Sequence, residues 1–283
     1  LLEDDIELSP FFYIYLKLAL LLYAYAYADA GAGADAGADA DAAPPPPLQL
    51  LGIALYTPRL VEISMPRRRI DLHSELRGAG AGAATPGGTA PLFLQQLPCS
   101  WGSLFFPRPW REFHRYMHRR LHERAAAVQI PRSATNGWST SWKKFLVELC
   151  FLRGWVVLYP NFANQTSFST NHLEPGEHIG GKANTLKHRP IDFVVPLMRD
   201  PRMLRELWTG AAGELRAPPP LGAHPVLDLF SERTTQARLT AQGSAAISAQ
   251  SELAAAVEGL RGEPESAPQQ FVQNLRLAVA GWL

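Results

Sequence analysis

The sequence predicts an α/β protein, because short apolar segments with strand character alternate with helical segments along its first two thirds. Proline or glycine closes the strand segments, and proline or a capping residue opens the helical ones. Residues 29–47 and 77–91 interrupt this alternation with Ala/Gly-rich low-complexity sequence that has little to bury. We therefore expect two disordered insertions in surface loops of a compact fold.

The composition changes near residue 199. Residues 1–198 carry the alternating pattern. A proline-rich linker over 217–225 follows, and residues 232–283 are rich in Ala, Gln and Glu and have a helical pattern. Hydrophobic residues make up 47% of the chain and charged residues 19%, which is enough for a sizeable core. We predict one α/β domain over 1–198 and a helical C-terminal extension over 199–283.

The first predicted helix opens at Ser9, an N-cap residue, with Pro10 at the first helical position. It enters the apolar stretch 11–28, whose length barely reaches the roughly 18–20 residues of a membrane-spanning helix. Lys17 inside the stretch and the Tyr-Ala alternation at its end favour a buried or half-buried helix. The alternative is a membrane-anchored or scaffolding protein.

The later elements follow in chain order. They are a strand over 50–58, two short strands within 92–107 separated at Pro98 and Gly102, a helix opened by Pro109, a helix over Trp142–Arg153 with Gly154 as its C-cap, a strand over 155–160, and a helix from Asp200 to about Leu215. Residues 161–190 form a loop too long for a simple connection, and their Asn, Thr, His and Glu content favours a functional role.

Charge and cysteine content narrow the function classes. The formal net charge is +1, and only Arg67–Arg69 suggest a basic patch, so we expect no nucleic-acid partner. Cys99 and Cys150 are too few for a disulfide framework and fit no zinc spacing. His114, His118 and His122 share one helix face, but the arginines interleaved with them favour a solvated basic face over a zinc site.

The chain opens on three consecutive acids, Glu3, Asp4 and Asp5. At the C-terminal end of a strand such acids would lie where open α/β sheets bind ligands, and their oxygen atoms suit Mg²⁺ or Mn²⁺. Alternatively, Asp4, Asp5 and Glu7 lie just before Ser9-Pro10 and could stabilise the positive end of a helix dipole. Taken alone, the three acids favour the helix.

The order of motifs along residues 1–180 resembles the GT-A-fold glycosyltransferases, in particular a β-1,2-N-acetylglucosaminyltransferase family. The resemblance rests on EDDIELSPFFYIYL, LLGIALYTP, CSWGSLFFP, PWREF, NGWSTSWKKF, LRGWVVLYP and NFANQTSFSTNHLEPGEH. It implies that residues 1–198 are the acceptor-side, C-terminal half of a GT-A (Rossmann-like) domain, in which the acids end a strand. The low-complexity insertions would interrupt this partial domain, and the helical tail would follow it. The resemblance also implies transfer of a sugar from a nucleotide-sugar donor to a hydroxyl group of a glycan or glycoprotein acceptor, with Mn²⁺ or Mg²⁺.

The same resemblance implies residue roles. Asp5 matches the acid that coordinates the metal, Glu3 and Asp4 match acids that face the ribose and the sugar, and Trp101 and Gly102 match a segment lining the pocket. A late histidine of the polar loop, His178, is the second expected metal ligand. The chain would then begin inside the domain, with a membrane anchor upstream and the catalytic domain on the lumenal side of the Golgi or endoplasmic reticulum membrane.

One departure concerns the catalytic base. The family carries an aspartate between two tryptophans, whereas the interval between Trp138 and Trp142 holds only Ser, Thr and Ser, which are not bases near neutral pH. A base must then come from elsewhere. The candidates are Glu148, Glu174, Glu177 and His172.

Overall fold

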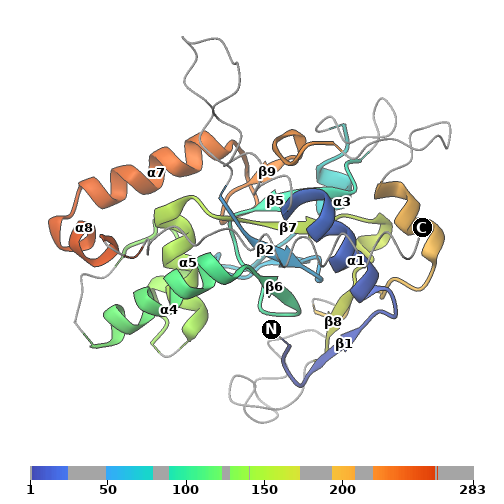
Figure 1. The fold of residues 1–283 in the computed structure, drawn as a ribbon, viewed down its shortest axis with the longest axis horizontal. Coiled ribbons are helices and arrows are strands. Elements are labelled where there is room, and N and C mark those ends of the chain that lie inside the picture. The colour runs from blue at the N-terminus through green and yellow to red at the C-terminus, as the bar shows by residue number, and fades with distance from the viewer. Residues whose placement is uncertain are drawn as a thin grey trace.

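A computed structural model describes residues 2–24, 49–78, 89–122, 128–139, 141–172, 193–207, 219–258 and 260. Its centre is a six-stranded mixed sheet with strand order β10-β9-β5-β7-β2-β6. The strands are β2 (Leu50–Ala54), β5 (Leu92–Gln95), β6 (Ser103–Phe105), β7 (Val156–Pro160), β9 (Val226–Leu227) and β10 (Arg233–Thr234). The protein is therefore of the mixed α/β class, as the sequence predicts (Figure 1).

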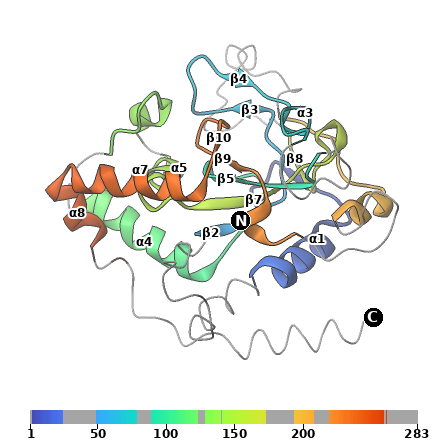
Figure 2. The same cartoon turned by 90° about the horizontal axis from the view of Figure 1, so that it is seen from above.

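Both faces of this sheet are buried, which explains why its strands read as continuous apolar runs. In β7, Val157 and Tyr159 join one apolar cluster, while Val156 and Leu158 join the other. The pairing of β7 with β2 is parallel, and its pairing with β5 is antiparallel. Figure 2 shows helix α1 (Phe12–Ala19) and the small ribbon of β3 (Leu60–Val61) and β4 (Arg68–Arg69) on opposite sides of the central strands.

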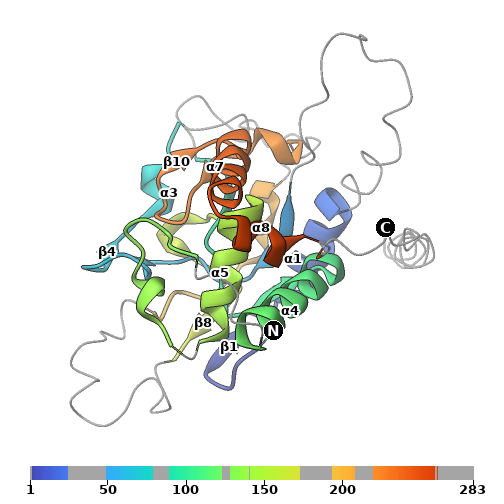
Figure 3. The same ribbon diagram turned by 90° about the vertical axis from the view of Figure 1, so that its left-hand side faces the viewer.

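Four helices pack together at one end of the molecule, in the foreground of Figure 3. They are α4 (Pro107–His122), α5 (Trp142–Arg153), α7 (Gln236–Ser248) and α8 (Ser251–Val257). The bounds of α5 agree with the sequence prediction, and Gly154 closes the helix in the left-handed conformation with φ 65°. Helix α4 begins two residues before the predicted Pro109. His114, His118 and His122 are exposed on α4, in agreement with a solvated face.

The C-terminal part of the chain does more than extend the protein with helices. β9 pairs in parallel with β5, and β10 continues the same sheet beyond β9. Short strands of two residues leave almost no periodic signal, so the sequence predicted only a helical pattern here. The segment after Asp200 forms a 3₁₀ helix over Pro201–Leu207, and the predicted continuation to Leu215 lies outside the described residues.

The N-terminal segment forms β1 (Ile6–Leu8), then α1 (Phe12–Ala19) and a π-helical turn over Leu20–Ala24. Ser9 does not cap α1 directly as predicted: its hydroxyl accepts a bond from the Phe11 N–H at 3.0 Å and closes the turn before the helix. In the part of the chain that the structure describes, no helix combines the length and apolarity needed to cross a membrane.

Two small antiparallel ribbons flank the sheet. β1 pairs with β8 (Ser169–Asn171), and β3 (Leu60–Val61) pairs with β4 (Arg68–Arg69), which leads into the short helix α3 (Leu72–Glu75). The insertion at 29–47 and most of that at 77–91 lie outside the described residues.

Candidate functional site

The N-terminal acids meet a strand within the predicted polar loop 161–190 at the β1–β8 ribbon. Ile6 is registered with Asn171, and the main-chain N–H of His172 donates to the carbonyl oxygen of Asp5 at 2.8 Å. Residues far apart in the sequence are thereby fixed side by side. This contact places Asp5 and His172, two of the residues singled out from the sequence, at one end of the ribbon.

The expectation that the acids end a strand is wrong, and so is the helix-dipole alternative. Asp4 and Asp5 form a turn, in which the Ile6 N–H bonds to the Glu3 carbonyl oxygen, and β1 begins after them. α1 carries no acid in its first turn, because β1 and the Ser9 turn separate it from the acidic cluster. The alternation that defines this strand is in Ile6–Leu8, where Glu7 is exposed between two half-buried apolar residues.

The carboxylate of Asp5 fits a cation. Its Oδ1 atom is buried and has no hydrogen-bond partner among the described residues. A buried carboxylate oxygen without a partner is costly, and a hard dication is one group that would satisfy it. In the described residues no group of three or more His, Cys, Asp or Glu side chains is arranged for a metal. His178, the second expected ligand, lies outside those residues, as do Glu174 and Glu177.

His172 is held by a carboxylate that the sequence analysis did not assign. Its Nε2 atom lies 2.8 Å from Oε2 of Glu7, and Oε1 of Glu7 accepts a bond from Arg199 at 3.3 Å. His172 and Glu7 are both close to half exposed, at 44% and 46% of their side-chain surface. An imidazole oriented by a carboxylate and open to solvent is suited to take a proton from a bound hydroxyl group.

Trp101 and Gly102 are tied to the same ribbon. The Ser169 hydroxyl in β8 donates to the Trp101 carbonyl oxygen at 2.7 Å, and the Leu55 N–H donates to the Gly102 carbonyl oxygen at 2.8 Å. Gly102 has φ +83°, and a Cβ atom there would lie 2.9 Å from Oγ of Ser169. Glycine is therefore required where this turn passes the ribbon.

The indole of Trp101 lies in an aromatic and charged environment. Its ring centroid is 4.9 Å from that of Tyr56 and 5.4 Å from that of Phe193, both edge to face. The Lys143 ammonium group lies 5.5 Å from the Trp101 centroid and is bonded to Glu62. An edge-to-face aromatic group beside an ion pair offers apolar and polar surface together, as small-molecule sites do.

Glu3 belongs to this neighbourhood. The Trp101 N–H donates to Sγ of Cys99 at 3.3 Å. Burial raises the pKa of the Cys99 thiol to about 12, and the nearby charges of Glu62 and Glu3 add to that increase while Lys143 opposes it. Cys99 is therefore a protonated, buried thiol, and Glu3 lies close enough to act on it electrostatically.

Glu148 has a structural environment and is withdrawn as a candidate base. Its side chain is buried in α5, where Oε2 accepts bonds from the Tyr116 hydroxyl at 2.9 Å and from Nε of Arg120 at 3.0 Å. Both partners belong to α4, so the carboxylate joins two helices inside the core. A buried ion pair of this kind has no access to an acceptor hydroxyl group.

Sequence reasoning missed Glu7, Glu62, Lys143, Tyr56 and Phe193. Glu7 was visible as the acid that follows the opening cluster, and Lys143 lies in the quoted WKKF stretch. The contacts of Glu62, Tyr56 and Phe193 come from segments far apart in the chain, so no local pattern indicated them.

The comparisons with known proteins add one short match. Residues 79–126 match the family described as the SPBC1E8.03c C-terminal domain, a stretch that includes β5, β6 and α4. No curated protein and no solved structure matches the chain.

Proposed function

We propose that the protein is a metal-dependent glycosyltransferase of the GT-A type, which moves a sugar from a nucleotide-sugar donor to a hydroxyl group of a glycan or glycoprotein acceptor. The observation that carries the proposal is the convergence of Asp5, His172 and the Trp101–Gly102 turn at the β1–β8 ribbon. The motif order suggested a shared role for these residues, and the mixed α/β sheet is compatible with that fold class.

The support for a dication is the buried Oδ1 atom of Asp5, which has no hydrogen-bond partner among the described residues. Asp5 would hold the dication, with His178 as the second expected ligand, and Mn²⁺ or Mg²⁺ would neutralise charge on the diphosphate leaving group when bound. Glu3 and Asp4 would face the ribose and the sugar. Asp4 is exposed and so accessible to a donor. The Trp101 indole would line the space in which the sugar and the acceptor meet.

His172 is the base that the geometry favours. As the acceptor oxygen bonds to the anomeric carbon, the nucleoside diphosphate leaves with the electron pair of the broken bond, and the acceptor proton goes to the imidazole. Glu7 at 2.8 Å would orient the ring and stabilise the imidazolium that forms. The role of Glu174 and Glu177, the other candidates, stays a prediction.

The test uses the full-length protein and a panel of nucleotide sugars with Mn²⁺. Transfer and donor hydrolysis are measured for the wild type, for His172→Gln and for His114→Gln, which alters an exposed histidine of α4. We expect transfer by the wild type and by His114→Gln, and a loss of about 100-fold or more in His172→Gln. A wild type that neither transfers nor hydrolyses any donor would indicate an inactive transferase domain or another function.

A further inference from the structure

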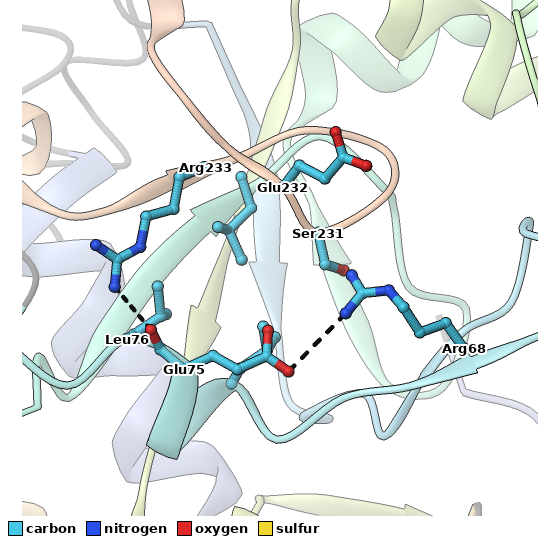
Figure 4. A pocket seen from close by; sticks show the side chains of 8 residues that line it. Arg68, Glu75, Leu76, Ser231, Glu232 and Arg233 are labelled. Atoms are coloured by element: carbon cyan, nitrogen blue, oxygen red, sulfur yellow. Dashed lines mark hydrogen bonds and ion pairs between the residues drawn. The ribbon is translucent and has the colours of Figure 1, made fainter.

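A cavity of about 370 Å³ lies away from the β1–β8 ribbon, between the β3–β4 ribbon, α3 and the turn that joins β9 to β10. Figure 4 shows side chains from these three segments directed toward one another. The lining residues are Arg68, Leu72, Glu75, Leu76, Leu227, Ser231, Glu232 and Arg233. Apolar side chains form part of the wall, and the two arginines supply its positive charge.

Both arginines are held in place through one nitrogen each. Nη2 of Arg68 donates to the Phe230 carbonyl oxygen at 2.9 Å, and Nη2 of Arg233 donates to the Glu75 carbonyl oxygen at 2.7 Å. These main-chain contacts fix the two guanidinium groups without neutralising them. Further N–H groups of each planar fork are left to bind an anion, and a fixed fork loses little entropy when it does so.

Ser231 adds a third donor to the same wall. It is buried, and its Oγ atom accepts a bond from Nε2 of Gln95 at 2.8 Å. Because Oγ of Ser231 accepts this bond, its O–H group remains available to donate one. The described part of the chain shows no acceptor for that O–H group. Ser231 and Arg68 line the same cavity, and both are labelled in Figure 4.

The acids of the cavity neutralise these donors only weakly. Glu75 approaches Arg68 with 3.9 Å between Oε1 and Nη1, and both side chains are close to half exposed. An exposed pair at that distance contributes little and can be displaced. Glu232 is bonded to Arg132 at 3.3 Å, and Figure 4 shows its carboxylate pointing away from Glu75 and Arg68.

We propose that this cavity binds a small oxyanion, a phosphate or carboxylate group, between Arg68 and Arg233 with the Ser231 hydroxyl as a third donor. Such an anion would take the position that the Glu75 carboxylate approaches only loosely. A second cavity of about 450 Å³ adjoins it through Glu232 and Arg233, and Arg132 and Arg238 add positive charge to its wall. The remainder of an anionic small molecule would have room there.

The experiment is a calorimetric titration of the full chain with inorganic phosphate, and separately with acetate, at constant ionic strength set by NaCl. We expect Arg68→Ala and Arg233→Ala each to weaken phosphate binding about tenfold or more, because each removes a charge-assisted donor. We expect Glu75→Gln to strengthen it about threefold or more, because the competing negative charge is lost. The acetate titration identifies which oxyanion the site prefers.

Two controls separate a built site from general attraction of anions. Arg202→Ala removes an exposed arginine paired with Asp200 and should leave binding unchanged. Arg233→Lys keeps the positive charge but loses the planar set of N–H donors. It should therefore bind phosphate clearly more weakly than the wild type. Absence of wild-type binding, binding as tight as the wild type in either alanine variant, or full binding with Arg233→Lys would overturn the proposal. Far-UV circular dichroism and melting temperatures show that each variant is folded.

Discussion

Glu7 holds the imidazole of His172 through a 2.8 Å contact between Oε2 and Nε2. Glu7 is in the middle of β1 and His172 follows β8, so the two-stranded ribbon brings them together. Glu7 acts through His172 and is a positioning residue in the proposed reaction.

We expect Glu7→Gln to lower kcat of sugar transfer by about tenfold or more with little change in KM, because orientation of the base matters in the transition state more than in substrate binding. Steady-state kinetics on the full-length protein measures both constants. Arg199→Ala is the matched control, since it removes the other partner of Glu7 and leaves the histidine contact in place. A change confined to KM, or an equal loss in Arg199→Ala, would argue against this role.

Gly102→Ala should destabilise the fold. The backbone at φ +83° is strained for alanine, and the new Cβ atom would lie 2.9 Å from Oγ of Ser169. We expect a loss of about 1–3 kcal/mol in the free energy of unfolding, measured by urea denaturation. Gly137→Ala is the control, because a Cβ atom there meets nothing within 4 Å. Equal stability of the two variants would contradict the geometry of the Trp101–Gly102 turn.

Glu148→Ala should lower the free energy of unfolding. This effect does not depend on a role of Glu148 in sugar transfer. Removing one partner of a buried pair leaves Arg120, whose side chain is 8% exposed, with an uncompensated charge. We expect a loss of about 3–5 kcal/mol in unfolding free energy. Asp200→Ala removes an exposed pair and should change stability little. If Glu148→Gln remained as stable as the wild type but lost all transfer, Glu148 would return as a candidate base.

His224 should make stability fall in mild acid. Burial lowers the pKa of its imidazole from 6.5 to about 4, and Nε2 lies 3.1 Å from the Tyr23 hydroxyl. Between these two pH values the unfolded chain binds a proton that the folded protein does not. Protonation therefore stabilises the unfolded state relative to the folded state. The loss should reach about 3 kcal/mol on going from pH 6.5 to pH 4.

Urea denaturation at a series of pH values measures this effect, and His224→Gln should flatten the dependence over that range. Other groups titrate there as well, so the comparison is the difference between wild type and variant. An identical pH dependence in both proteins would show that His224 does not supply it.

Elements with strong local signals were predictable from the sequence. Helix α5 shows its C-cap at Gly154, and β5 and β6 are separated where Pro98 and Gly102 fall. The buried strand β7 was visible as an apolar run after that glycine. In each case the signal lies within a few residues of the element, which is the range over which caps and turns act.

The other strands and the arrangement of the candidate site were not predictable, because they depend on contacts between distant segments. β1 is recognisable only through its pairing with β8, so the acids that seemed to end a strand instead precede one. β9 and β10 have two residues each, and they are strands because β9 pairs with β5 and β10 pairs with β9. Of the candidate site, Asp5, Trp101, Gly102 and His172 could be named from motif order, but Glu7 needed the ribbon.

The most direct test of the central claim, a dication site at Asp5, is the Mn²⁺ dependence of nucleotide-sugar turnover by Asp5→Asn. The full-length wild type, Asp5→Asn and Asp200→Asn are compared over a range of Mn²⁺ concentrations, the last altering an exposed aspartate elsewhere. We expect the wild type and Asp200→Asn to be activated alike, and Asp5→Asn to lose turnover or to need at least about tenfold more Mn²⁺. Unchanged turnover and Mn²⁺ requirement in a folded Asp5→Asn protein would contradict the account.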